Sequence, residues 1–589
     1  MLWRFRQNPP EDFIKQFPEY PPKILQLLWN RGLRQQAQID EFFNPDYKED
    51  LHDPFLMLGV REAVKVIFKA IKRQEPVAIF GDYDADGVCG AVILETVLRA
   101  LGANSVQVYI PDRHIEGYGL NAAAVEKIAK EGVKLILTVD CGVNDFKEIK
   151  LANSLKMEVI VVDHHHISKR LPPARVVIDP HQKNEKYPFS NLAGAGVAFK
   201  LAQALARSTK QKMTVKGNEN GQTGIADGWE KWLLDLVALA TVADCVPLLG
   251  ENRTLVRYGL YVLAKTRRVG LQELMRVARI NPTVNGEELK TNLNTYSLAF
   301  VLAPRLNAAA RIEHANIAYN LLKTDSFVEA TQLAQELDQK NRERQKITDV
   351  MVAEIEERIK DKLADKERFV IVEADTKWRV GMVGLAAGKI SDKHHRPTVI
   401  FFQDGENLRG SARSIEKFNI IEALDECAEF LKEYGGHPGA AGLSLSEKNL
   451  ADFEACLNKI AKEKLTPEDL LPTLEIDSVL DVDETDWEFF DKLERFEPFG
   501  QGNEQPVFAL KNLEITGLRY VGNNSKHLKL ELKGGKLFDK AFRAIGFNLG
   551  KNGASNLQIG DRVDVAFELI ADEWNGTRNL QLKIVDIKK

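Results

Sequence analysis

Four short apolar segments, separated by helical patterns, constrain the fold of this chain more than any other feature. They are PVAIFGD, SVQVYIPDR, VKLILTVDCG and EVIVVDHH, with helical stretches such as NAAAVEKIAKEG between them. Apolar residues run continuously in these segments, which is typical of strands buried on both faces of a parallel sheet. The pattern therefore predicts an α/β lobe in which helices cover both faces of the sheet.

Carboxylates and histidines gather where these predicted strands end. They occur in GDYDADG, TVDCG and VDHHH, and again in ATVADCVP, where we expect one more strand end: Asp82, Asp84, Asp86, Asp140, Asp163, His164, His165 and Asp244. Because the carboxyl ends of parallel strands open onto one crevice, these side chains are expected to converge. Oxygen and imidazole ligands suit Mn²⁺ or Mg²⁺. The large number of candidate ligands favours a site with two metal ions, and two-metal sites hydrolyse phosphodiesters.

Each cluster also has a plainer interpretation. GDYDADG is compatible with a solvated turn, Asp140 and Asp244 with helix caps, and the histidines with surface positions. The convergence of all four clusters at one edge favours the metal site. The first strand is not followed by G-x-G-x-x-G, so a dinucleotide site is disfavoured.

Pattern and charge divide the rest of the chain. Residues 1–50 are expected to form an N-terminal arm, 51–325 the first lobe, 326–366 an uninterrupted helix, and 367–465 a second, smaller α/β lobe in which 414–436 is mostly helical. Residues 468–505 carry a net charge of −11, which predicts an acidic connector over 466–506. Residues 507–589 carry +5 and about five alternating strands, which predicts a small β-barrel of the OB type. The whole-chain charge of −5 thus does not exclude a nucleic-acid partner.

Cysteine usage and hydropathy predict a cytoplasmic protein without membrane contact. The five cysteines are scattered and form no CxxC pair, so neither a zinc ribbon nor a disulfide framework is supported. The N-terminal residues lack the apolar run of a signal peptide. The most apolar window, residues 232–249, contains Asp235 and Asp244 and makes a poor membrane span.

The motifs GDYDADG, VDCG, VDHHH and VADCVP, in this order, resemble motifs I to IV of the DHH phosphoesterase superfamily. The likeness continues through PDRHIEGYGL, LNAAARI, GSARS, GGHPGAAG and EPFGQGN, from about residue 50 to the end. Over this length the chain is similar to the bacterial exonucleases of the superfamily that degrade single-stranded DNA. The resemblance implies a DHH lobe, a connecting helix, a DHH-associated lobe and an OB-fold.

Carried onto this sequence, the resemblance implies roles for individual residues. Asp82 and Asp140 would hold one metal ion. The second ion would be held by Asp84, Asp140, His164 and Asp244. His165 would face the scissile phosphate, and Asp86 would support either the loop or the water held by the metal ions; with Asp140, these two are the implied catalytic residues. Substrate contacts are implied for Arg113, Arg305, Arg311, Ser411, Arg413, Gly436 and His437, and single-strand binding by the barrel for Tyr520, Lys526, Lys529 and Trp574.

Plainer roles stand beside these assignments. Each arginine is as compatible with a structural ion pair, GGHPGAAG with a helix cap and tight turn, and the barrel aromatics with core positions.

The implied function is metal-dependent, single-strand-specific 5′→3′ DNA exonuclease activity with two ions per site. The products would be 5′-mononucleotides, and the role would lie in DNA repair and recombination. A monomer in the bacterial cytoplasm is expected, with a single-strand-binding protein and a RecQ-type helicase as partners. One alternative is a DHH phosphoesterase of small substrates, such as oligonucleotides or pyrophosphate, but such relatives generally lack the barrel. A non-catalytic DNA-binding scaffold is disfavoured because the metal-binding carboxylates are all present.

Overall fold

The computed structural model describes residues 1–168, 170–215, 225–285, 289–365, 367–534, 540–550, 556–574 and 577–589. The side chains of 210–215, 540, 573, 574 and 577 lie outside this description. The chain forms two compact units. One contains Asp46–Pro247 and Glu251–Leu470; the other contains Met1–Pro45, Leu248–Gly250 and Leu471–Lys589.

The first lobe of the larger unit is built on a five-stranded parallel sheet with the strand order β3-β2-β4-β5-β6, as the sequence predicts. Its strands are β2 (Val77–Gly81), β3 (Val106–Tyr109), β4 (Leu135–Val139), β5 (Glu158–Val162) and β6 (Val176–Ile178). Every residue of β2 and β4 is buried, which explains their continuous apolar sequences. From β2 the chain first adds β3 on one side, and then β4, β5 and β6 on the other. The crevice between β2 and β4 is therefore the switch point at which such sheets bind ligands.

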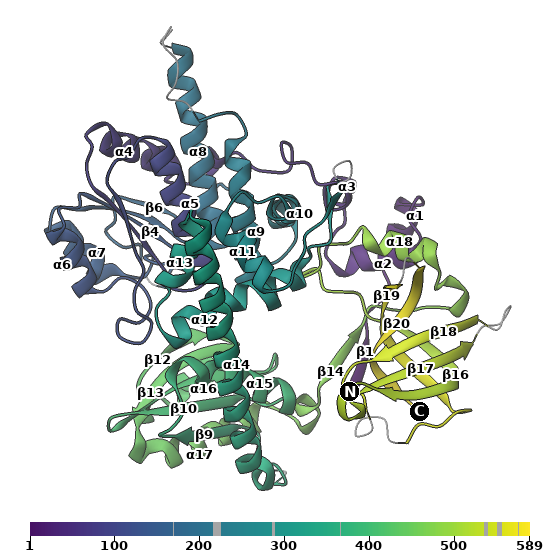
Figure 1. Ribbon diagram of the computed structural model, residues 1–589. Helices are drawn as coiled ribbons and strands as arrows, with labels where there is room; N and C mark the ends of the chain where they lie inside the picture. The colour runs from purple at the N-terminus through teal and green to yellow at the C-terminus, as the bar shows by residue number, and fades with distance from the viewer. Residues whose placement is uncertain are drawn as a thin grey trace. The chain divides into compact units, whose positions relative to one another are not determined.

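Helices cover both faces of this sheet (Figure 1). They include α4 (Val60–Lys72), α5 (Ala85–Ala100), α6 (Ala122–Lys130), α7 (Phe146–Ser154), α8 (Gly194–Val215) and α9 (Leu234–Ala243). Helix α9 corrects one prediction, because Asp244 was expected at a strand end and instead caps the end of this helix. Every described residue from Leu234 to Val242 is buried. A short helix that is apolar all round has no amphipathic period to separate it from a buried strand.

A second group of helices closes the first lobe and joins it to the next. It contains α11 (Val269–Val277), η3 (Ser297–Leu302), α12 (Ala303–Ile312), α13 (Asn316–Lys323) and α14 (Phe327–Lys362). Helix α14 confirms the predicted long helix; Ser326 caps its start by accepting a hydrogen bond from the Glu329 backbone N–H. Its buried residues Met351, Ile355 and Ile359 recur every four positions and pack in the second lobe against α15 (Val380–His394).

The second lobe carries a mixed five-stranded sheet with the order β12-β13-β11-β10-β9. Its elements are β9 (Ile371–Asp375), β10 (Thr398–Asp404), β11 (Asn407–Arg413), α16 (Ile420–Glu426), β12 (Leu431–His437), β13 (Ala440–Ser446) and α17 (Leu450–Lys464). The predicted helix over 414–436 is wrong in its second half, because LKEYGGH forms the edge strand β12. The hairpin with β13 supplies the backbone hydrogen bonds that overrule the helical preference of Leu, Lys and Glu here. The glycines of GGHPGAAG consequently lie in a hairpin and do not cap a helix.

The smaller unit contains the predicted barrel. Its strands are β16 (Phe508–Val521), β17 (His527–Gly534), β18 (Lys540–Gly546), β19 (Arg562–Trp574) and β20 (Thr577–Lys588), and β15 (Ser478–Val479) extends the sheet. Pairing of β16 with both β17 and β19 closes the sheet into a barrel.

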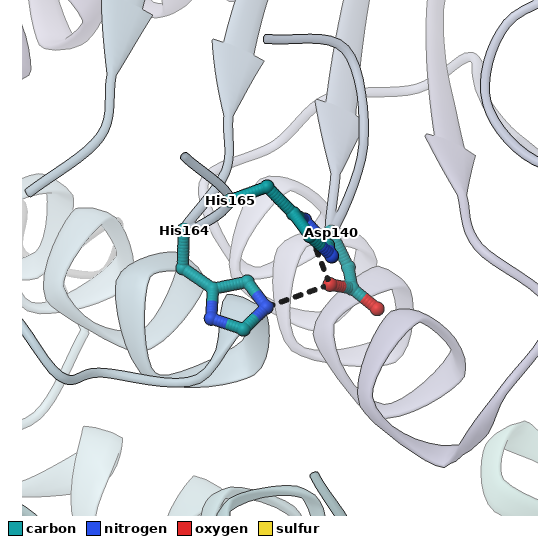
Figure 2. A group of neighbouring side chains, drawn as sticks. All are labelled: Asp140, His164 and His165. Carbon is teal, nitrogen blue, oxygen red and sulfur yellow. Dashed lines mark hydrogen bonds and ion pairs between the residues drawn. The ribbon is translucent and has the colours of Figure 1, made fainter. Parts of the chain in front are cut away.

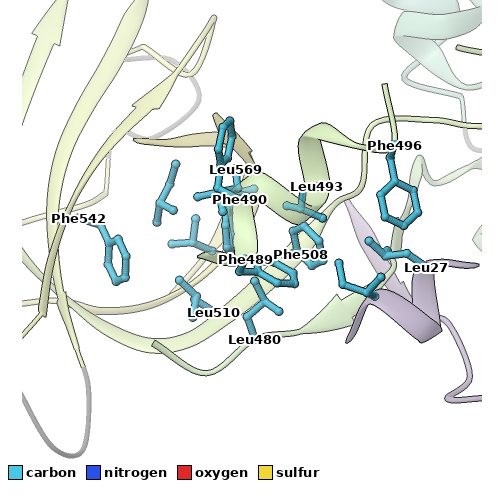
Figure 3. Packing of buried hydrophobic residues seen from close by; sticks show 14 of the residues in the cluster. Leu27, Leu480, Phe489, Phe490, Leu493, Phe496, Phe508, Leu510, Phe542 and Leu569 are labelled. Atoms are coloured by element: carbon cyan, nitrogen blue, oxygen red, sulfur yellow. The ribbon is translucent and has the colours of Figure 1, made fainter. Parts of the chain in front are cut away.

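The core of the smaller unit also draws on residues expected in the N-terminal arm and the acidic connector. Leu27 of α2 (Pro22–Asn30) and Phe489, Phe490 and Leu493 of α18 (Trp487–Glu494) belong to one cluster with Phe508 of the barrel (Figure 3). Acidic side chains thus accompany an ordered helix whose apolar face is buried. The predicted domain boundaries at residues 50, 325, 366, 465 and 506 stay predictions.

Two sequence expectations concern the whole chain. All five cysteines are free thiols. Among the described residues, every helix is either too short or too polar to cross a membrane.

Candidate metal centre

Local backbone geometry places the carboxylates at the switch point of the parallel sheet. Asp82 follows β2, and Asp84 caps helix α5 by accepting hydrogen bonds from the backbone N–H groups of Asp86 and Gly87 at 2.9 and 3.1 Å. Asp140 follows β4 with a φ of +59°, a left-handed conformation that Asp and Asn tolerate better than most residues. The N-terminus of α8 packs so close that a Cβ on Gly194 would lie 2.8 Å from the Asp140 Cβ.

Three overlapping groups of ligand atoms form at this point. They are Asp82 with Asp84 and Asp140, Asp86 with His164 and Asp244, and Asp140 with His164 and His165; in each group the atoms lie within 4.8 Å of one another. His164 Nε2 is 3.1 Å from Asp140 Oδ1 and 3.7 Å from Asp244 Oδ2. Figure 2 shows both histidine rings directed toward the Asp140 carboxylate. The predicted ligands therefore come together, with Asp140 at the centre.

Crowding makes the ionised form of these carboxyls costly. Burial and then the neighbouring Asp84 raise the pKa of Asp82 well above its ordinary value, and burial together with Asp86 does the same to the pKa of Asp140. Burial and Asp86 raise the pKa of Asp244 to about 9. Like charges in a low-dielectric site repel strongly, so a bound cation would lower these pKa values.

Asp86 has a different environment from the other carboxylates. Its two oxygens accept hydrogen bonds from the backbone N–H groups of Gly194 and Ala195 at 2.7 and 2.8 Å. Burial and the charge of Asp84 raise the pKa of Asp86 to about 7. The hydrogen bonds tie the start of α8 to the start of α5, which fits the supporting role expected from the sequence.

The two histidines are held in different protonation states. Burial, and then the charge of His165, lowers the pKa of His164 to about 4, so its imidazole is neutral and able to bind a metal. Burial alone would lower the pKa of His165, but the hydrogen bond between its Nδ1 and Asp163 Oδ1 at 2.8 Å raises that pKa to about 9. Asp163 in turn is 1 % exposed and also accepts from the Val143 backbone N–H.

These residues fit divalent cations. Among the described residues, none donates a hydrogen bond to the buried oxygen Oδ1 of Asp82. Buried oxygens without a donor are rare, because they cost free energy unless a partner or an ion satisfies them. A set of carboxylate oxygens with one neutral imidazole is the donor chemistry of Mn²⁺ and Mg²⁺ sites.

The metal ligands border a cavity of about 290 Å³. Arg113 and Arg311 line it, and both also line a second cavity of about 550 Å³ that reaches into the second lobe. Ser411 and Arg413 lie in the second cavity, where Arg413 Nη1 donates to Ser411 Oγ at 2.8 Å. Burial and Arg113 lower the pKa of Arg311 to about 9. Two cationic side chains thus bridge the two cavities.

Other predicted contacts do not join these cavities. Arg305 forms an ion pair with Asp338 at 2.9 Å and lines neither of them. Gly436 and His437 end strand β12 outside the cavity lining; a Cβ on Gly436 would lie 2.3 Å from the Ala440 carbonyl oxygen. Gly435 and Gly442 of the same hairpin do line the second cavity.

The predicted single-strand contacts of the barrel lie in the smaller unit. Lys526 and Lys529 are exposed, and Tyr520 is partly buried against the barrel core. The side chain of Trp574 lies outside the described residues.

Three cavity residues were not singled out from the sequence. Asn307 lines the metal cavity and accepts a hydrogen bond from the Ala85 backbone N–H at 2.7 Å, which fixes the GDYDADG loop. Tyr118 donates to the Asp140 carbonyl oxygen at 3.0 Å and lies 3.2 Å from His165 Nδ1. Tyr83 stacks under Arg113. Only their positions within the motifs LNAAARI, EGYGL and GDYDADG could have indicated these residues from the sequence, because none of the three is a typical metal ligand.

Three family profiles match the chain. They are described as "DHH family, N-terminal domain" over residues 76–241, "DHHA1 domain" over 367–463 and "RecJ OB domain" over 476–586. Their order agrees with the order of the lobes and the barrel in the structure.

Curated relatives match along nearly the whole chain. The single-stranded-DNA-specific exonuclease RecJ of Bacillus subtilis is 37 % identical over 591 residues, covering 100 % of this chain and 70 % of the relative. The RecJ protein of Haemophilus influenzae is 33 % identical, covering 96 % of this chain and 95 % of the relative. The RecJ protein of Escherichia coli is 32 % identical, covering 97 % of this chain and 96 % of the relative.

Comparison with solved structures points to the same relatives. Thermus thermophilus RecJ in complex with Mn²⁺ superposes with a TM-score of 0.81 at 30 % identity, covering 100 % of this chain and 79 % of that one. The complex of the same protein with Mg²⁺ superposes with a TM-score of 0.75 at 28 % identity, covering 100 % of this chain and 78 % of that one. With the three profiles in this order, and with relatives of 32–37 % identity matching along nearly its whole length, the chain belongs to the RecJ family of single-stranded-DNA-specific exonucleases of the DHH superfamily.

Proposed function

We propose that this protein is a metal-dependent exonuclease that degrades single-stranded DNA from its 5′ end and releases 5′-mononucleotides. One observation carries the proposal: the carboxylate and histidine cluster borders a cavity that shares Arg113 and Arg311 with a second, glycine-lined cavity. The names and high identity of the relatives support single-stranded DNA as the substrate.

Two divalent cations would be held at the switch point of the sheet. Asp82 and Asp140 would hold one ion, and Asp84, Asp140, His164 and Asp244 the other, so that Asp140 bridges them. The grouping of Asp82 with Asp140 and of His164 with Asp244 supports these sets, whereas Asp84 groups with Asp82 and Asp140, and Asp86 is the carboxylate that groups with His164 and Asp244. Such ions, when bound, activate water and neutralise charge that develops on a phosphodiester. RecJ structures with Mn²⁺ and with Mg²⁺ support either metal as the cofactor.

The protein's own groups would orient the scissile phosphate. His165 carries a proton at neutral pH because its hydrogen bond to Asp163 raises its pKa to about 9, so it can donate a hydrogen bond to a phosphate oxygen. Tyr118 lies against the same ring and restricts its orientation. Asp86 holds the start of α8 in place and keeps Asp140 close to Gly194.

The second cavity would bind the terminal 5′ phosphate. Arg413 and Ser411 offer a guanidinium and a hydroxyl in one place, the donors that phosphate oxygens prefer. Strand polarity follows, because a phosphate held there puts the first phosphodiester beside the metal ligands. Gly435 and Gly442 lack side chains that would fill the cavity.

The barrel, the biological role and the partners of the protein are also part of the proposal. Lys526 and Lys529 are exposed cations on the barrel and suit the phosphate backbone of a longer strand. A role in DNA repair and recombination, a monomeric state, a cytoplasmic location, and a single-strand-binding protein and RecQ-type helicase as partners stay predictions.

Product analysis tests the proposal. Oligonucleotides carrying radioactive phosphate at the 5′ end, or a dye at the 3′ end, are digested after removal of metal with EDTA and titration with Mn²⁺ or Mg²⁺. We expect the 5′ label to leave first as a mononucleotide, while the 3′-labelled strand shortens stepwise. Asp140→Asn is the inactive control, and its backbone is compatible with the positive φ.

Other results would contradict the proposal in distinct ways. Stepwise loss of the 3′ label first would reverse the polarity. Equal digestion of blunt duplex would remove the strand specificity. Faster turnover of dinucleotides than of long single strands would favour the small-substrate alternative.

A further inference from the structure

Two large aromatic side chains without a role in the proposed chemistry lie exposed on the helical segment that leads to the metal cavity. Tyr296 is 64 % exposed and Phe300 is 67 % exposed. Their rings lie 5.1 Å apart at 31°, so they present one continuous aromatic surface. Phe300 belongs to η3, a short π-helical stretch, and such stretches occur frequently at functional sites.

This aromatic pair begins a stripe that leads along η3 and α12 to the metal ligands. Residues 296, 300, 304, 307 and 311 are exposed or half-buried, whereas Leu302, Leu306 and Ala308 are buried. Spacings of four, four, three and four residues keep the stripe on one helix face. The stripe ends at Asn307 and Arg311, which line the metal cavity.

The stripe also has a direction relative to the substrate. Arg311 faces both cavities, and the proposed 5′-phosphate site lies in the second one. Asn307 and then Phe300 lie progressively farther from that site along the helix. A strand bound 5′ end first would therefore leave the metal ligands toward Phe300 and Tyr296. At the α-helical rise of about 1.5 Å per residue, which is an upper value for the wider π-helical turns of η3, these side chains lie at most about 10 and 16 Å along the axis from Asn307.

Resting on the function proposed above, we propose that Tyr296 and Phe300 stack against bases of the bound single strand on the 3′ side of the cleaved bond. With a rise of about 3.4 Å per stacked nucleotide, the distance corresponds to about three to five nucleotides beyond the metal ligands. Because the cleaved bond follows nucleotide 1, these are about bases four to six from the 5′ end. Aromatic platforms bind bases without sequence preference because every base has a flat π face. Such stacking requires an unpaired base, so the platform would favour a single strand over a duplex.

A coupled substitution experiment tests the platform. The full-length double variant Tyr296→Ala/Phe300→Ala is compared with wild type on a 12-nucleotide strand, and on the same strand with abasic sites at nucleotides 4–6. We expect each change alone to raise KM about tenfold with little change in kcat, the size expected for a lost stacked base. Combined, they should raise KM no further, because both remove the same contact.

Controls separate the platform from folding and from the proposed function. Phe327→Ala removes an aromatic side chain of similar exposure, 63 %, at the start of α14, and should leave KM unchanged. Tyr296→Phe/Phe300→Tyr keeps both rings and should behave as wild type. Abasic sites at nucleotides 8–10 should not raise KM, a test that needs only the wild-type protein.

Two results would overturn the platform. One is an increase in KM from abasic sites at nucleotides 4–6 that is equally large in wild type and in the double variant. The other is a double variant with the wild-type KM. If wild type does not digest the 12-nucleotide strand from its 5′ end, the proposed function itself fails, and this outcome is distinct from both.

Discussion

Neutralising Asp140 should make the metal-free protein more stable while removing its response to metal. Asp140→Asn keeps the size of the side chain and suits the φ of +59° at this position. It removes one negative charge from the centre of a group in which the oxygens of Asp82, Asp84 and Asp140 lie within 4.8 Å of one another. Two unit charges at that distance repel by about 3 kcal/mol at an effective dielectric constant of about 20. Since proton uptake by the carboxylates relieves part of this repulsion, we expect Asp140→Asn to raise the free energy of unfolding of the metal-free protein by about 2 kcal/mol.

The gain should depend on pH. Burial and nearby carboxylates raise the pKa of Asp86 to about 7 and that of Asp244 to about 9. A carboxyl whose pKa is raised on folding binds more protons in the folded state, so its contribution to stability is present below about pH 4 and is lost as the pH rises through the folded values. The free energy of unfolding of Asp140→Asn should therefore exceed that of wild type at pH 8 in EDTA, and the difference between the two proteins should shrink at pH 5.

Thermal unfolding with and without metal measures both effects. A gain of about 2 kcal/mol corresponds to a rise of about 4 °C in Tm for a large domain. Saturating Mn²⁺, at about 100 times its Kd, should stabilise wild type by about 2.7 kcal/mol and the variant much less. Asp235→Asn is the matched control, because Asp235 is equally buried but pairs with Arg268 at 3.5 Å, so this change should destabilise. Lower stability of Asp140→Asn than of wild type in EDTA at pH 8 would refute the electrostatic reasoning.

Three further predictions separate structural cations from substrate cations. Arg305→Ala removes one of two cationic partners of Asp338, which keeps Arg342 at 2.6 Å. Losing hydrogen bonds to a charged group should lower the free energy of unfolding in urea by about 2 kcal/mol, while the KM for DNA stays within about twofold of wild type; a large KM change would contradict a structural role. Arg413→Ala should raise KM about tenfold for strands with a 5′ phosphate but not for strands with a 5′ hydroxyl, and equal effects on both would contradict the phosphate site. Lys526→Glu/Lys529→Glu should lower the salt dependence of single-strand binding by about 1.4 in the log–log slope, measured by filter binding, and an unchanged slope would remove both lysines from the interface.

The structure also changes how the barrel should be tested. Removing residues 507–589 looks like a clean deletion in the sequence, but Phe508 packs with Phe489, Phe490 and Leu27 in one core. The deletion would expose these side chains and confound binding with folding. Charge reversal at exposed lysines avoids that problem.

Much of the metal centre was predictable because it depends on local rules. Continuous apolar segments indicate parallel strands, and the ends of such strands share one edge, so the sequence predicts that Asp82, Asp140 and His164 lie together, as they do. The long helix α14 was predictable for a similar reason, since its buried face repeats at helical spacing without Pro or Gly. The order of the motifs along the chain further identified the superfamily.

Other features depended on which surfaces meet. Asp244 reaches the site from the end of helix α9. Residues 229–280 are expected to be largely helical, but Asp244 is expected at a strand end, since the period of a segment that is apolar on every side does not distinguish a helix from a buried strand. The strand β12 has helix-forming residues that adopt an extended form only beside β13.

The arginines show the division most clearly. By itself, the sequence determined that Asp and His ligands would converge and that cationic side chains stood in neighbouring motifs. Only the tertiary structure decided that Arg305 faces Asp338 while Arg311, six residues later, faces both cavities. Local sequence encodes the period and burial of an element, but a charged side chain takes its role from the partner that folding brings against it.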